Sequence, residues 1–135
     1  MVESIQDQED QERRLTAVIL CDELCEIIGG DICRDYFLYE LISFQDDTEF
    51  KIRREVVTRL VRLSRLLEEK MFAGVIIPFY RKLSSDPMWS VRKACVEILP
   101  HIANIASNDV KNVQLVPLFE KFSKDNSKWV KTTAL

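Results

Sequence analysis

The sequence predicts an all-α solenoid built from helix-turn-helix units with a period of 39 residues. An acid, an apolar residue and a base recur in this register three times: Asp47, Ile52 and Arg53; Asp86, Val91 and Arg92; Asp125, Val130 and Lys131. The same interval relates apolar positions and two prolines: Leu41, Tyr80 and Phe119; Phe44, Leu83 and Phe122; Pro78 and Pro117. A fixed period of about 20 to 50 residues indicates stacked structural repeats.

The register divides the chain into a polar segment, 1–10, and a repeat domain, 11–135. Residues 11–28 are expected to form the second helix of a partial unit, because their apolar positions lie one period before those of a later helix. The units 33–69 and 72–106 follow, and 111–135 is again partial. Gln8 stands where the first acid is expected. We therefore expect a solenoid that is truncated at both ends.

The unit 72–106 shows how one repeat is built. Its first helix is the apolar run 75–84, which ends where Ser84-Ser85-Asp86-Pro87 favours a turn. The second helix is predicted from apolar residues three or four positions apart: Val91, Cys95, Ile98, Ile102 and Ile105. Pro100 is expected to kink this helix rather than end it, because the apolar stripe continues on both sides. The unit 33–69 has a corresponding stripe: Ile52, Val56, Leu60, Leu63 and Leu67.

Two-helix units of this length, with Asp in the turn and Arg early in the second helix, resemble HEAT repeats. In such a stack the Asp of one turn can accept hydrogen bonds from the Arg of the adjacent unit, and it suits the positive end of the following helix. We assign three pairs to this inter-repeat ladder: Asp47/Arg53, Asp86/Arg92 and Asp125/Lys131. Lysine makes a point contact rather than a fork, so the last pair should be weaker.

Composition excludes several classes of protein. A net charge of −3 and a pI near 5.3 argue against a general nucleic-acid-binding protein. No apolar run is long enough to predict a membrane span, and the charged residues 1–14 do not resemble a signal peptide. We expect a cytoplasmic or nuclear location.

Catalytic and metal-binding signals are weak. His101 is the only histidine, and the three glycines cannot form a phosphate-binding loop. The cysteines contain no CxxC pair, so core positions are favoured over a zinc site: Cys21, Cys25, Cys33 and Cys95. We expect neither enzymatic activity nor a cofactor.

A group of arginines lies on one predicted helix: Arg53, Arg54, Arg59, Arg62 and Arg65. Acidic neighbours favour a solvated face over the alternative, a surface for an acidic or phosphorylated partner. Trp89 and Trp129 lie at corresponding turns, one position out of register. Each could pack under the adjacent turn or contact a partner, since Trp is frequent at binding hot spots.

The segments DPMWSVRKAC and DNSKWVKTTAL resemble the HEAT-repeat scaffold and regulatory subunits of Ser/Thr phosphatases of the 2A and 4 types. The resemblance covers 33–135. It implies a non-catalytic subunit that positions a phosphatase catalytic subunit and its substrates, with contacts from the turns within repeats. The matching partner-binding positions are Met88, Trp89, Lys128 and Trp129. The alternative is a HEAT scaffold for another assembly, in nuclear transport or on chromatin.

Overall fold

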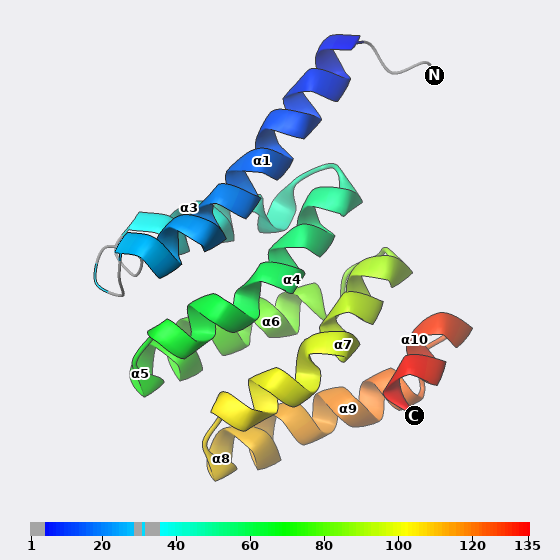
Figure 1. The fold of residues 1–135 in the computed structure, drawn as a ribbon. Coiled ribbons are helices and arrows are strands. Elements are labelled where there is room, and N and C mark those ends of the chain that lie inside the picture. The colour runs from blue at the N-terminus through cyan, green and yellow to red at the C-terminus, as the bar shows by residue number, and fades with distance from the viewer. Residues whose placement is uncertain (1–4, 29–30, 32–35) are drawn as a thin grey trace.

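The computed structural model describes residues 5–28, 31 and 36–135, and it stacks their helices in two layers (Figure 1). The second helices of the units form one layer, in which each packs on the next: α1 (Ile5–Ile28), α4 (Phe50–Leu66), α7 (Trp89–Ile105) and α10 (Lys128–Ala134). The first helices lie along them: α3 (Leu38–Ser43), α6 (Ile77–Leu83) and α9 (Val116–Ser123). The predicted all-α solenoid is confirmed.

The first helices of the last two units each consist of three consecutive helical segments. α5 (Glu69–Met71) and the π-helical segment η3 (Phe72–Ile76) lead into α6, while α8 (Asn108–Val110) and the π-helical segment η4 (Lys111–Leu115) lead into α9. Each π segment ends just before a repeated proline, Pro78 or Pro117. Proline has no N–H and its ring crowds the carbonyl four residues earlier, so a wider turn accommodates it.

The helix boundaries add detail to the expected units. α1 begins at Ile5 and therefore includes much of the polar segment 1–10. Residues 33–35, at the start of the unit 33–69, lie outside the described residues, and the short 3-10 helix η2 (Phe44–Asp46) ends its first helix. α7 continues through Pro100 to Ile105.

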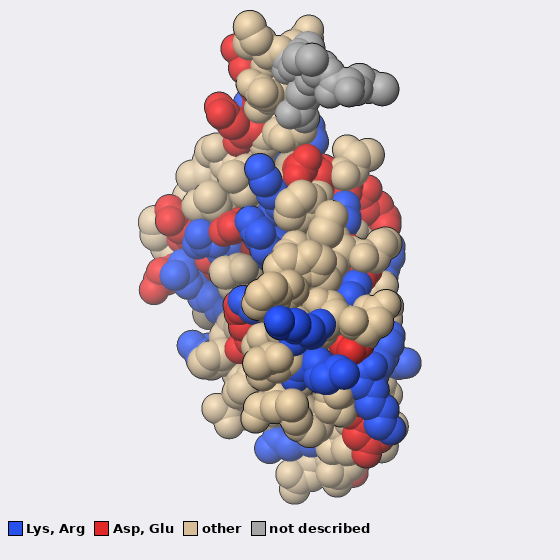
Figure 2. Space-filling view, turned by 90° about the vertical axis from the view of Figure 1, so that its right-hand side faces the viewer, with Lys and Arg blue, Asp and Glu red and all other residues tan. Residues whose placement is uncertain are grey.

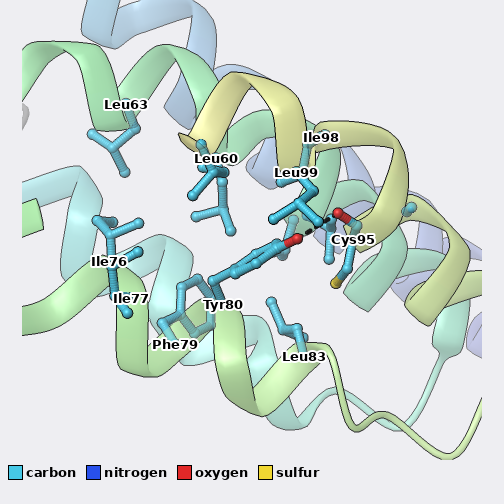
Figure 3. Packing of buried hydrophobic residues seen from close by; sticks show 14 of the residues in the cluster. Leu60, Leu63, Ile76, Ile77, Phe79, Tyr80, Leu83, Cys95, Ile98 and Leu99 are labelled. Carbon is cyan, nitrogen blue, oxygen red and sulfur yellow. Dashed lines mark hydrogen bonds between the residues drawn. The ribbon is translucent and has the colours of Figure 1, made fainter. Parts of the chain in front are cut away.

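One core runs through the stacked units, and Tyr80 lies at its centre (Figure 3). Its side chain is fully buried, and Leu60 of α4 and Leu99 of α7 both lie above its ring in Figure 3. Its hydroxyl donates a hydrogen bond of 2.5 Å to the carbonyl oxygen of Cys95. Burial raises the pKa of Tyr80, so the hydroxyl stays protonated. Each unit thus completes its core with side chains from its neighbours.

The stacking places all turns between first and second helices at one edge of the solenoid, on the right in Figure 1. We call this the turn edge: it contains the turns 44–49, 84–88 and 124–127 and the first residues of α4, α7 and α10. The links between units lie at the opposite edge. Within the described residues, no helix has the length and apolar character needed to cross a membrane.

Candidate functional site

The three turns at this edge have the same local geometry. Each turn carboxylate accepts a hydrogen bond from the backbone N–H two residues later: Asp47 from Glu49 at 2.9 Å, Asp86 from Met88 at 2.9 Å, and Asp125 from Ser127 at 2.8 Å. An Asp side chain that binds its own backbone in this way fixes the turn. The repeated acid therefore sets the direction in which each second helix begins.

The same carboxylates also receive a forked arginine from the preceding unit. In each pair the arginine Nε donates to Oδ2 of the aspartate and Nη2 donates to Oδ1. These two distances are 2.7 and 3.2 Å for Arg14 and Asp47, 2.7 and 3.0 Å for Arg53 and Asp86, and 2.9 and 3.0 Å for Arg92 and Asp125. Two-pronged contacts of this kind are among the strongest hydrogen bonds in proteins. They tie each second helix to the next turn along the stack.

The expected hydrogen bonds between adjacent units are present, but they join other residues than the assigned pairs. Arg53 and Arg92 contact the Asp of their own unit only through its backbone carbonyl, at 2.6 and 2.8 Å. Their carboxylate partners belong to the next unit. Lys131 is exposed and meets no carboxylate within 36–135 or 5–28. Arg14, which the predicted ladder omits, lies one period before Arg53 and makes the first contact of the series.

Asp125 illustrates the electrostatics of these contacts. Burial alone would raise its pKa, but hydrogen bonds from Arg92 and the Ser127 amide, with the nearby charge of Lys121, lower the pKa overall. The unfolded carboxyl titrates near pH ~3.9. Because the folded pKa is lower, the stabilisation is complete above about pH 4 and is lost as the pH falls through the folded value.

We therefore expect Asp125→Asn to lower the free energy of unfolding by about 1 to 3 kcal/mol at pH 7, as for hydrogen bonds to charged groups. The difference from the wild type should be smaller at about pH 2, below the ordinary pKa of the carboxyl. Urea unfolding followed by circular dichroism at both pH values measures it. Asp109→Asn, at an exposed acid on α8, is the control and should have little effect. A cost for Asp125→Asn that is unchanged at pH 2 would contradict the assignment.

The structure brings the predicted partner-binding tryptophans together at this edge. The ring centroids of Trp89 and Trp129 are 6.2 Å apart with an interplanar angle of 34°. The Lys128 ammonium lies 5.2 Å from the Trp129 ring centroid. Trp89 is 41% exposed and Trp129 is 55% exposed, so neither is simply packed under the adjacent turn. Met88 is partly buried against the core beside them.

A further aromatic residue occupies the corresponding place in the preceding unit. Phe50 begins α4 one period before Trp89, and the Arg54 guanidinium lies 5.7 Å from its ring centroid. The predicted binding positions did not include Phe50, although its place in the register is visible in the sequence. Each second helix from α4 onward therefore has, within its first two residues, an aromatic ring next to a cation or another ring.

The arginines of α4 have acidic neighbours. Arg59 contacts Asp22 at 3.1 Å and Glu55 at 2.8 Å, and Arg62 contacts Glu26 at 3.2 Å. Asp22 is buried, so its charge needs these partners. These contacts favour the solvated, neutralised face over a docking surface for an acidic partner.

The other candidate side chains lie away from the turn edge. Cys21 and Cys95 are buried free thiols, Cys25 is buried but disulfide-bonded, unlike the expected free core cysteine, and Cys33 lies outside the described residues. Burial raises the pKa of Cys95 to about 12, so this thiol is unreactive at neutral pH. His101 is exposed on α7. No group of three or more metal-binding side chains occurs among the residues that the structure describes.

Comparison with known proteins agrees with this geometry. The HEAT repeat family profile matches residues 76–106. Serine/threonine-protein phosphatase 4 regulatory subunit 1 from Homo sapiens is 23% identical over 129 residues, as are its counterparts from Mus musculus and Rattus norvegicus. The match covers 95% of this chain but 14% of each relative. The chain thus has the fold of an all-α solenoid of HEAT repeats, and it resembles a regulatory subunit of a serine/threonine phosphatase.

Proposed function

We propose that this chain is part of a non-catalytic scaffold or regulatory subunit that positions a Ser/Thr phosphatase catalytic subunit of the 2A or 4 type and its substrates. The exposed pair of Trp89 and Trp129 at adjacent turns carries the proposal. The similarity to a phosphatase regulatory subunit supports the choice of partner. A cytoplasmic or nuclear location is part of the proposal.

The turn edge has the physical properties of a binding surface. Large aromatic side chains that remain exposed can bury much apolar area when a partner docks. The Asp and Arg contacts hold the turns in place, so binding would order little additional backbone. A scaffold of this kind needs no catalytic group, because bringing an enzyme and its substrate together raises their effective concentration.

We expect Trp89→Ala with Trp129→Ala to weaken binding of a purified 2A-type or 4-type catalytic subunit by about 30-fold or more, the effect of losing a hot spot of about 2 kcal/mol. Isothermal titration calorimetry measures this affinity. Helix content should be unchanged in circular dichroism, because both side chains are substantially exposed.

Phe119→Ala is the matched control. Phe119 is an aromatic residue that is 45% exposed, but it lies on α9 rather than at the start of a second helix. Its replacement should leave the affinity within about twofold of the wild type, as expected for residues outside a hot spot. If the double tryptophan variant bound as tightly as the wild type, the turn edge would not be the surface that binds the catalytic subunit.

A further inference from the structure

A second surface lies on the first-helix side of the turns, between α6 and α9. It is an open groove with a volume of about 470 Å³. Its lining combines an apolar strip, Pro78, Val113 and Pro117, with three basic side chains, Arg81, Lys82 and Lys121. No carboxylate lines it. The chain as a whole carries a net charge of −3, so this groove is locally opposite in charge to the rest of the protein.

Two of the three basic groups have only neutral hydrogen-bond partners. Arg81 donates to Gln114 Oε1 at 2.9 Å, and Lys121 donates to Ser85 Oγ at 2.5 Å. Neither makes an ion pair with any described residue. The charge of Lys121 helps to lower the pKa of Asp125, but the carboxylate of Asp125 already binds Arg92. These charges are therefore available to an anionic ligand.

The repeat register explains why this groove is basic. Lys82 and Lys121 are one period apart, and so are Asp46 and Ser85. In the earlier turn Asp46 contacts the Lys82 ammonium at 2.7 Å. In the later turn the neutral Ser85 takes the place of that acid.

A neighbouring groove lies between the turns 44–49 and 84–88 and has a different charge. Three aspartates line it, Asp46, Asp47 and Asp86, against the basic residues Arg53 and Lys82. Both linings include Lys82 and Ser85, but carboxylates line only this second groove of the two.

We propose that the groove between α6 and α9 binds an extended acidic segment of a partner protein. The carboxylates of that segment would contact Arg81 and Lys121, and an apolar side chain would lie on the strip of Pro78 and Pro117. Basic side chains gather on the turn side of the molecule, in the lower half of Figure 2. Charge complementarity selects such a partner. A single nucleic-acid strand is a poorer fit, because the lining contains no aromatic ring on which a base could stack.

The test is fluorescence anisotropy with a fluorescein-labelled peptide that is rich in glutamate and contains a central leucine. A peptide with glutamine in place of glutamate should bind at least about tenfold more weakly, because it lacks the charges. Lys121→Glu should also weaken binding of the glutamate peptide by about tenfold, since it reverses a contacting charge. Ser85→Asp removes no basic group. It gives Lys121 an acid, as Asp46 does for Lys82, and should weaken binding by about fivefold.

Two exposed positions outside the groove provide matched controls. Lys70→Glu on α5 changes the net charge as much as Lys121→Glu, and Thr58→Asp on α4 changes it as much as Ser85→Asp. Both should leave the affinity unchanged. Equal losses at Lys70 and Lys121, or equal binding of the two peptides, would overturn the proposal. So would an RNA oligonucleotide that displaces the peptide and loses its own binding with Lys121→Glu. Because the Trp89 and Trp129 surface is not involved, these outcomes do not depend on the phosphatase assignment.

Discussion

Replacement of Asp86 by alanine should lower the free energy of unfolding by about 3 to 5 kcal/mol, the cost of breaking a buried ion pair. The Asp86 side chain is 6% exposed and that of Arg53 is 14% exposed. The carboxylate accepts two hydrogen bonds from Arg53 and one from the Met88 amide. Its removal therefore leaves the guanidinium without its anion and the turn without its fixed geometry.

A double-mutant cycle separates the ion pair from the turn. Arg53→Met alone should cost less than Asp86→Ala, because Asp86 keeps the Met88 amide as a partner. The double variant should be more stable than the sum of the single changes predicts, by about 1 to 3 kcal/mol of coupling energy. Urea unfolding monitored by circular dichroism measures all four free energies, with a fluorescence probe to detect units that unfold separately.

Asp46→Ala is the control for this prediction. Asp46 belongs to the equivalent region of the preceding turn and pairs with Lys82, but its side chain is 73% exposed. Exposed ion pairs contribute at most about 1 kcal/mol, so this variant should unfold almost as the wild type does. Equal costs for Asp46→Ala and Asp86→Ala would show that the forked contacts do not hold the units together.

The sequence predicted which residues form the ladder better than it predicted how they pair. A period of 39 aligns Asp86 with Asp47 and Arg92 with Arg53, but this alignment alone does not say whether a base reaches its own turn or the next one. The answer depends on the direction of the long Arg side chain across the stack. Arg53 reaches both, with Nη1 on the Asp47 carbonyl and the fork on Asp86.

Arg14 was missed because of the same ambiguity in pairing. Gln8 stands in place of the turn acid, and pairing within one unit therefore predicts no contact for the first unit. Because the arginine binds the following turn, the contact needs Arg14 and Asp47 rather than an acid at position 8. The base one period before Arg53 is the signal in the sequence that identifies it.

The tryptophan pair could not be predicted in full for a different reason. Trp89 and Trp129 are 40 positions apart, one more than the period. A shift of one residue turns a side chain by about 100° around a helix, so register alone suggests that the two rings diverge. Both lie in the first turn of their helices, where the side chains are substantially exposed and the rings meet at 6.2 Å. Their contact depends on that geometry.

Tyr80→Ala should lower the free energy of unfolding by about 3 to 5 kcal/mol, as for other large aromatic residues that leave a cavity in a core. Tyr80 is fully buried and lies where three helices meet, so neighbouring units can collapse only partly into the space (Figure 3). Tyr80→Phe keeps the ring and removes the hydrogen bond to the Cys95 carbonyl. That change should cost about 1 to 2 kcal/mol.

The repeat itself supplies the control for Tyr80. Phe119 occupies the equivalent position one period later, yet it is 45% exposed. Phe119→Ala should therefore lower the free energy of unfolding by about 1 kcal/mol or less. Folding buries less apolar area at this side chain than at Tyr80, and its removal leaves no closed cavity. Thermal and urea unfolding of the three variants would measure the differences. If Phe119→Ala and Tyr80→Ala were equally costly, the side chain at 119 would have to be buried in solution. The environment made by the neighbouring units, rather than the position within the repeat, therefore determines what each aromatic residue contributes.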